Sequence, residues 1–145
     1  MVSSNIVSKE GREFFEAFAS LTKRVRALAS ARYAELGLGS TQAKFLRHIE
    51  SGISQADLAR ATDTAPALLG RAIEPLIERG WIRRTRSETD RRQYDLELTA
   101  SGKRMRERVE AVRNAMSEEL DRALDDRDRA DFERIAKKLL AHLDG

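Results

Sequence analysis

The stretch that decides the fold is LIERGWIRRTRSETDRRQYDLELTASGKRM, residues 76–105. Within it, Trp81–Arg86 has the composition of a strand, and Ser87–Asp90 has turn chemistry. In Tyr94–Leu98, apolar and polar residues alternate with the period of a half-buried strand. The stretch therefore predicts a β-hairpin with a charged tip, followed by a helix that Thr99 caps.

Two helices are predicted directly before this hairpin, within residues 54–80. Ser54 and Asp57 have the spacing of a capping box and begin a short helix. After a tight turn, Thr64 is expected to cap a longer helix, which has Pro66 in its first turn and ends at Gly80. A short helix, a turn, a longer helix and a hairpin together predict a winged helix-turn-helix.

Further amphipathic helices are predicted on both sides, so the fold class is mainly α. They cover residues 10–35, roughly 41–51 (capped by Ser40 or Thr41), a long segment after Thr99 and, beyond a break near 124–126, the C-terminal residues. Three apolar stripes result, at Phe14/Phe18/Leu21, at 105–120 and at 132–143. One subunit could hardly bury all three, so a partner subunit is expected, with a self-closed monomeric bundle as the alternative.

Composition excludes several classes of function. The 145 residues contain no Cys and only two His, which argues against disulfides, thiolate metal centres and thiol redox sensing; no metal site is expected. No Gly-rich phosphate loop or nucleophile–base constellation is present, so we expect no catalytic residues, no cofactor and no enzymatic activity. Neither an apolar run of about 20 residues nor a secretion signal is visible, so we expect a cytoplasmic protein without a membrane partner.

The basic residues are unevenly placed. Of 27 basic residues 21 are Arg, and residues 79–92 hold six Arg against two acidic residues. Arginine suits phosphate and base edges, so double-stranded DNA is the expected partner of this segment. Arg71 on the longer helix could reach a guanine edge or a phosphate, and the wing tip would carry Arg91 and Arg92 toward a minor groove. The alternatives are a solvated surface for the charge run and an ordinary surface residue for Arg71.

Residues 76–105 resemble the family of multiple-antibiotic-resistance regulators (MarR). The matching positions are Arg79, Gly80, Trp81, Ile82, Arg84, Asp90, Arg91, Arg92, Leu96, Leu98, Thr99 and Gly102. The resemblance implies a homodimeric transcription regulator, by default a repressor, on a pseudo-palindromic operator. It also implies that residues 1–36 and 103–145 form a dimerisation domain, and that residues 40–102 form the winged helix-turn-helix.

The resemblance assigns roles in the wing. It implies that Arg92 enters the minor groove, that Asp90 holds the wing by pairing with arginine, and that Arg91 contacts phosphate or shares the task. The helix at 66–79 departs from the family, because Ala65-Pro66-Ala67 offers fewer hydrogen-bond donors than the family's usual start. The full set of expected DNA-binding residues is Ser54, Gln55, Thr64, Ala65, Pro66, Ala67, Leu68, Arg71, Arg84, Arg86, Asp90, Arg91 and Arg92.

Many members of the family release DNA when a small aromatic acid or phenol binds, which implies an effector here as well. An aromatic wall with nearby cations suits an aromatic carboxylate, and the candidate residues are Phe18, Arg24, Arg26, Tyr33, Arg47 and His48. The plainer interpretation makes them core or surface residues. The competing functions are a winged-helix module for protein–protein contact and an architectural DNA binder without an effector.

Overall fold

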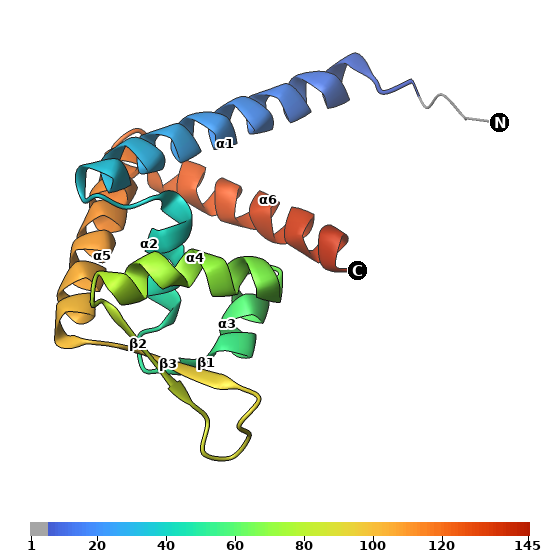
Figure 1. The fold of residues 1–145 in the computed structure, drawn as a ribbon. Helices are drawn as coiled ribbons and strands as arrows, with labels where there is room; N and C mark the ends of the chain where they lie inside the picture. Colours follow the sequence, from blue (N-terminus) through green and yellow to red (C-terminus); the bar gives the residue numbers. More distant parts are fainter. Residues whose placement is uncertain (1–5) are drawn as a thin grey trace. The chain divides into compact units, whose positions relative to one another are not determined.

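The computed structural model describes residues 6–145 as a mainly helical chain with one small sheet (Figure 1). The expected order of four helices, a hairpin and two helices is confirmed, and so is the winged helix-turn-helix fold. The elements are α1 Lys9–Glu35, α2 Ser40–His48, β1 Ile53–Ser54, α3 Gln55–Ala61, α4 Pro66–Glu78, β2 Ile82–Arg86, β3 Tyr94–Leu98, α5 Ala100–Asp121 and α6 Asp126–Asp144.

The sheet is antiparallel with strand order β1-β3-β2. Leu96 of β3 pairs with Ile53 of β1 on one side, and Leu98 pairs with Ile82 of β2 on the other. Leu96 and Leu98 are buried, as their alternation with polar residues predicts. The sequence did not predict β1, because a two-residue strand carries no period. The hairpin of β2 and β3 projects from α2, α3 and α4 as the wing (Figure 1).

The fully buried core lies in the winged helix-turn-helix, with Val109 of α5 added to it. Each helix that covers the sheet contributes apolar residues from one stripe, at the three- and four-residue spacing of an amphipathic helix. The largest fully buried side chains are Phe45, Leu46, Ile49, Leu58, Leu69, Ile73, Leu76, Leu96 and Val109. This core fixes the position of α4 relative to the wing.

Two helix starts differ from expectation. Gly39, not Ser40 or Thr41, is the N-cap of α2, and the Gln42 side chain accepts a hydrogen bond from its backbone N–H at 3.0 Å. The helix also ends at His48 instead of near residue 51. Ala65, not Thr64, is the N-cap of α4, and it supplies no side-chain cap.

The other expected caps are present. Ser54 Oγ accepts from Asp57 N at 3.0 Å, and Thr99 Oγ1 accepts from Gly102 N at 3.0 Å. Gly80 follows the C-cap of α4 with φ 75°, the left-handed conformation that glycine adopts most easily.

The chain divides into two compact units, Met1–Glu110 and Ala111–Gly145, and the division falls inside α5. Of the apolar stripe at 105–120, Met105, Val109 and Met116 are buried and Leu120 is exposed, so most of this stripe is covered within the chain itself. The first five residues of the expected dimerisation segment 1–36 lie outside the described residues. Along residues 6–145, no helix is long and apolar enough to cross a membrane.

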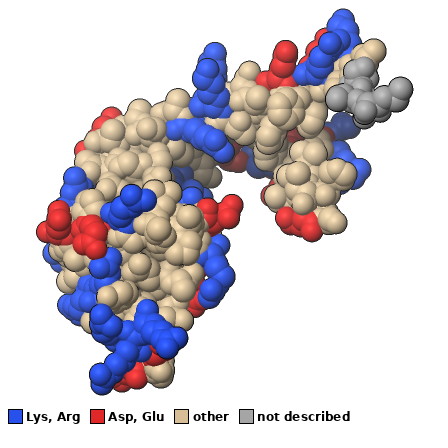
Figure 2. Space-filling model, turned by 45° about the vertical axis from the view of Figure 1, so that its right-hand side comes forward, with Lys and Arg blue, Asp and Glu red and all other residues tan. Residues whose placement is uncertain are grey.

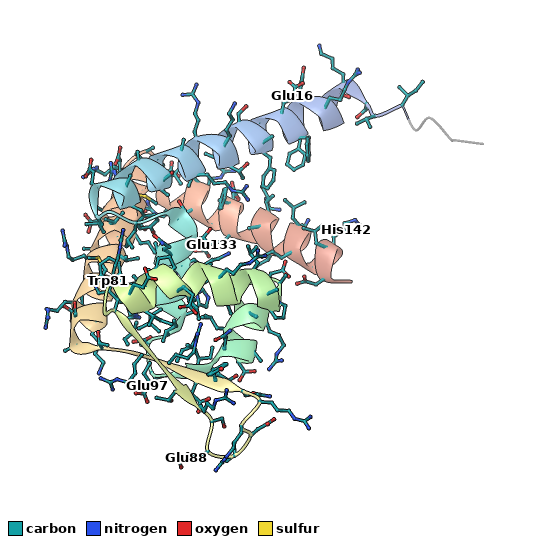
Figure 3. All side chains as sticks on the ribbon, in the orientation of Figure 1. Glu16, Trp81, Glu88, Glu97, Glu133 and His142 are labelled. Carbon is teal, nitrogen blue, oxygen red and sulfur yellow. The ribbon has the colours of Figure 1, made fainter. Side chains whose placement is uncertain are left out.

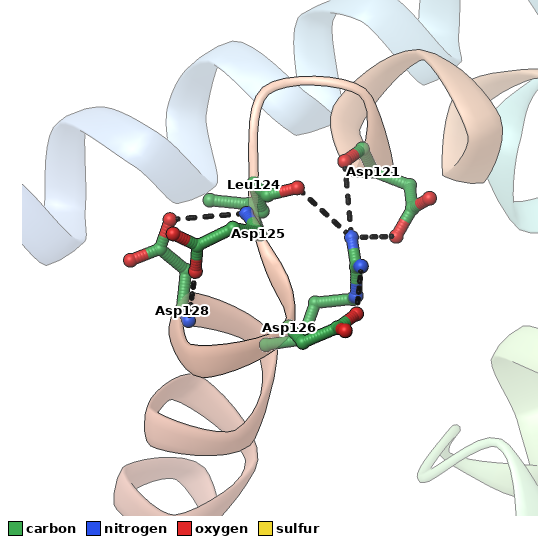
Figure 4. Close-up of polar contacts among 6 residues, drawn as sticks. Asp121, Leu124, Asp125, Asp126 and Asp128 are labelled. Carbon is green, nitrogen blue, oxygen red and sulfur yellow. Dashed lines mark hydrogen bonds and ion pairs between the residues drawn. The ribbon is translucent and has the colours of Figure 1, made fainter.

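The predicted break between the last two helices is confirmed (Figure 4). Asp125 is the N-cap of α6, and it exchanges hydrogen bonds with Asp128 in a capping box. Arg129 Nη2 donates to Asp126 at 2.6 Å, and its Nη1 donates to Asp121 at 2.9 Å. The hydrogen bond to Asp126 is the main reason that the pKa of Arg129 is raised, and the charge of Asp121 adds to it.

Candidate nucleic-acid interface

The turn between α3 and α4 is held by hydrogen bonds of its own threonines. Thr62 is buried, and its hydroxyl donates to the Leu58 carbonyl at 2.7 Å. The Thr64 hydroxyl lies 3.0 Å from the Thr62 hydroxyl, and it can also donate to the Thr62 carbonyl at 3.2 Å. Asp63 between them has φ 49°, a conformation that aspartate tolerates better than most residues. The Thr64 hydroxyl is therefore engaged in hydrogen bonds within the turn, and this explains why Thr64 does not cap α4.

The first turns of α4 present two different faces. Leu69, Ile73 and Leu76 are fully buried, whereas Leu68 and Arg71 are exposed. No hydrogen bond or ion pair within residues 6–145 is found for the Arg71 guanidinium. A helix that packs with one apolar stripe leaves the opposite stripe free, and this accounts for the two faces.

The loop of the wing is ordered by its own short side chains. Ser87 Oγ accepts from the backbone N–H groups of Thr89 and Asp90, each at 3.3 Å. Asp90 Oδ1 accepts from the backbone N–H of Arg92 at 3.0 Å. The resemblance implies that Asp90 pairs with an arginine, and in the structure its partner is the backbone of Arg92. Arg91 and Arg92 are exposed, so both guanidinium groups are available to an anionic partner.

Two other arginines of the hairpin have partners inside the protein. Arg84 Nη1 lies 2.8 Å from Glu74 Oε1 of α4, and Arg86 Nη1 donates to the Arg91 carbonyl at 2.8 Å. The Tyr94 ring lies 5.2 Å from the Arg84 guanidinium and 5.3 Å from that of Arg86, within cation–π range. The ion pair between Arg84 and Glu74 joins the wing to α4, and the other contacts lie within the wing. Nothing in the sequence pattern identified Tyr94 or Glu74 as part of the site.

A cavity of about 170 Å³ lies where the wing meets the starts of α3 and α4. Its lining brings three of the expected DNA-binding residues together, Gln55, Pro66 and Arg92, with Ala56, Gln93 and Tyr94. In the space-filling view, Lys and Arg gather at the end of the molecule where the wing lies (Figure 2). Glu88 lies at the tip of the wing loop, so the basic surface carries one acidic group at its end (Figure 3).

Comparison with known proteins places this geometry in a family. The sequence model of the MarR family matches residues 36–93, which hold the helix-turn-helix and the wing up to the start of β3. The transcriptional repressor MprA of Escherichia coli strain K12 is 32% identical over 92 residues, which cover 63% of this chain and 52% of MprA. Residues 36–93 of this chain thus match the MarR family.

Solved structures agree with this assignment at the level of the fold. The MarR-family regulator AbsC from Streptomyces coelicolor superposes with a TM-score of 0.88 at 18% identity, covering 98% of this chain and 99% of AbsC. A mutant form of Escherichia coli MarR, solved in complex with operator DNA, superposes with a TM-score of 0.78 at 21% identity, covering 88% of this chain and 94% of that one. The chain spans about half the length of the curated relatives that it matches.

The six effector candidates lie in different surroundings. Phe18, Arg24 and Arg26 are exposed on α1, and Tyr33 is buried near the end of that helix. Arg47 Nε lies 3.1 Å from Glu110 Oε1, so its charge is already paired. The sixth candidate, His48, is exposed, and its Nδ1 lies 2.9 Å from the Lys44 carbonyl.

Apolar side chains remain exposed in the first helix and in the C-terminal unit. On the N-terminal half of α1 they are Phe14, Phe15, Phe18 and Leu21. In the C-terminal unit, Leu120 and Leu124 lie before α6, and Phe132, Ile135, Leu140 and Leu143 lie on it. Contiguous exposed apolar surface is typical of sites that contact another molecule.

Proposed function

We propose that this chain is a cytoplasmic, homodimeric, non-enzymatic transcription repressor that binds a pseudo-palindromic operator in double-stranded DNA. One observation carries the proposal: three exposed arginines, Arg71, Arg91 and Arg92, have no acidic partner among residues 6–145 and lie in the first half of α4 and at the wing tip. Two comparisons support it, since a relative is a transcriptional repressor and a similar fold was solved with operator DNA.

Each part of the winged helix then has a role on the duplex. The start of α4 enters the major groove, where Arg71 can bind a guanine edge or a phosphate. The wing carries Arg92 into the neighbouring minor groove, with Arg91 on the phosphate backbone. Asp90 contributes by fixing the backbone of Arg92. Ser54, Gln55 and Thr64 to Leu68 complete the expected interface around the start of α4.

The dimer is proposed to form through residues 1–36 and 103–145, with residues 40–102 as the DNA-binding domain. The exposed apolar side chains of α1 and α6 support this, because two-fold pairing would remove them from water. Light scattering after size-exclusion chromatography should give twice the mass of 16.4 kDa at micromolar concentration. Phe132→Glu should shift this mass toward the monomer, because Phe132 is exposed on α6.

We also propose that a small anionic aromatic compound releases the repressor from DNA. The support is the side-chain chemistry of α1, where Phe18 offers an aromatic face and Arg24 and Arg26 offer exposed cations. Tyr33, Arg47 and His48 complete the proposed set. Benzoates, hydroxybenzoates and cinnamates at millimolar concentration should weaken operator binding. An unchanged operator affinity across this panel would remove the effector from the proposal.

The test of the main proposal is DNA binding by fluorescence anisotropy, with duplexes from the upstream region of the chain's own gene and excess random competitor. A sequence-specific dimer should prefer its operator by roughly 10³-fold or more and protect two half-sites about 10 bp apart. Arg92→Ala should weaken binding, and Arg91→Ala should reduce the slope of log K against log salt by about 0.9 for one lost phosphate contact. Arg108→Ala, which removes an exposed charge from α5, is the matched control and should change neither.

The competing functions give different results in the same assay. An architectural DNA binder would bind operator and competitor alike, and its affinity would depend on salt but not on sequence. A winged-helix module for protein contact would bind neither duplex. If binding disappears with competitor, or if Arg92→Ala and Asp90→Ala both leave the affinity unchanged, the proposed operator interface is wrong.

A further inference from the structure

The surface that α4 offers to a major groove is almost entirely apolar. Ala65, Pro66, Ala67 and Leu68 are exposed there, and Arg71 follows one turn later. The neighbouring polar groups are largely engaged: the Thr64 hydroxyl bonds within the turn, and Ser54 caps α3. Arg71 is therefore the exposed polar side chain best placed to donate hydrogen bonds from the first two turns of α4.

Gln55 adds few hydrogen-bond donors to this surface, because its side chain is directed toward α4. Its Nε2 would lie 3.4 Å from a β-carbon placed on Gly70, and its Oε1 is buried without a hydrogen-bond partner among residues 6–145. The Gln55 amide thus packs beside Gly70 at the base of α4. This leaves Ala67 and Leu68 as the side chains that extend from the helix toward a partner.

Leu68 is exceptional in its exposure. Between residues 22 and 119 it is the one large apolar side chain that the structure leaves exposed, with 55% of its surface accessible. The adjacent Leu69 is fully buried, so α4 packs against the core through the face of Leu69 and leaves the face of Leu68 outside it. Leu68 and Arg71 are three residues apart, and Ala67 and Arg71 are four apart, so the three side chains share one face of the helix.

Resting on the proposed function, we propose that Ala67 and Leu68 select the operator by contact with thymine methyl groups in each half-site. The C5-methyl of thymine is the apolar group that the major groove displays, and small or branched apolar side chains are its natural partners. A polyanionic partner is favoured over an apolar protein surface, because unpaired Arg71 lies beside Leu68. Arg71 would then supply the one hydrogen-bonded base contact of α4.

The experiment compares thymine with deoxyuridine, which keeps every hydrogen-bonding group of thymine and lacks only the methyl. Duplexes are first selected from a random pool with the full-length protein, and thymines are then replaced one at a time in the selected half-sites. Removal of one contacted methyl should weaken binding about 4-fold, or about 16-fold when both half-sites are changed, because a buried methylene contributes on the order of 0.8 kcal/mol. The same replacement in flanking DNA should have no effect.

Two variants assign the effect to its side chain. Leu68→Ala should weaken binding to the thymine duplex and bring the thymine-to-uracil ratio close to one at the contacted position. Arg71→Ala is the matched control: it should weaken binding to both duplexes and keep that ratio. Both positions are exposed, so far-UV circular dichroism and urea unfolding should show folds like the wild type.

The possible outcomes separate this inference from the proposed function. A selected duplex that binds equally well with uracil throughout its half-sites overturns methyl recognition and leaves the regulator proposal standing. A thymine preference that survives Leu68→Ala overturns the assignment to Leu68. Selection that enriches no sequence overturns the regulator proposal, and methyl recognition fails with it.

Discussion

Gly102 offers the sharpest test of how the wing is joined to the helix that follows. It is buried in the first turn of α5, and its N–H donates to Thr99 Oγ1 at 3.0 Å. A β-carbon at this position would lie 2.9 Å from the carbonyl carbon of Trp81 and 3.2 Å from its α-carbon, with the carbonyl oxygen closer still. Carbon atoms normally meet at about 3.5–4.0 Å, so Gly102→Ala requires the backbone of Trp81 or of α5 to move.

The size of the effect follows from three contributions. Overpacking against backbone typically costs about 1–3 kcal/mol. The Thr99 N–H donates to the same Trp81 carbonyl at 3.1 Å, and losing that hydrogen bond would cost about 1 kcal/mol more. Alanine gains up to about 1 kcal/mol over glycine in a helix. The free energy of unfolding should therefore fall by about 1–3 kcal/mol, as the sum of these terms.

Gly70→Ala is the matched control, because it makes the same chemical change inside α4. The nearest neighbour of its β-carbon is the flexible Gln55 side chain at 3.4 Å, so the gain in helix propensity should be nearly all that is seen. Urea unfolding at one fixed protein concentration, followed by circular dichroism, measures both variants. If Gly102→Ala is as stable as Gly70→Ala, the close approach of α5 to Trp81 is wrong.

Three further predictions follow from named contacts. Asp90→Ala should weaken operator binding less than Arg92→Ala and leave the salt slope unchanged, because Asp90 fixes the backbone of Arg92 and does not face phosphate; a loss of slope like that expected of Arg91→Ala would contradict this. A double-mutant cycle with Glu74→Ala and Arg84→Ala should give a coupling of about 0.5–1 kcal/mol in urea unfolding, since the pair is partly exposed; additive effects would show that the ion pair contributes nothing. Thr99→Val should cost about 1–2 kcal/mol through loss of the N-cap, with Thr99→Ser close to wild type; a fully stable Thr99→Val would remove the capping role.

Much of the winged helix could be predicted from residues close together in the chain. Ser54, Gly80 and Thr99 lie at helix ends as predicted, because a cap depends on hydrogen bonds to residues three or four positions away. The alternation in Tyr94–Leu98 likewise gave the correct buried face of β3. The arginines of the wing tip were found by composition alone, since they need no partner in the protein to be exposed.

One missed feature was local, and another depended on segments that are distant in the sequence. Thr64 does not cap α4, because Thr62, two residues away, engages its hydroxyl. Met105 and Val109 belong to an apolar stripe whose packing partner the sequence did not predict, and the fold buries both. A local sequence pattern shows that a helix has an apolar stripe, but it does not show which other segment that stripe packs against.

The sequence by itself determined the order of the helices and the hairpin, the caps that depend on local hydrogen bonds, and the segment that carries the basic charge. Only the tertiary structure decided which arginines are free. Arg84 is directed to Glu74, ten residues away, whereas Arg71 on the same helix as Glu74 meets no acidic partner. The physical reason is range: periodicity and capping act within about one helical turn, while the choice of an ion-pair partner depends on how separate elements pack.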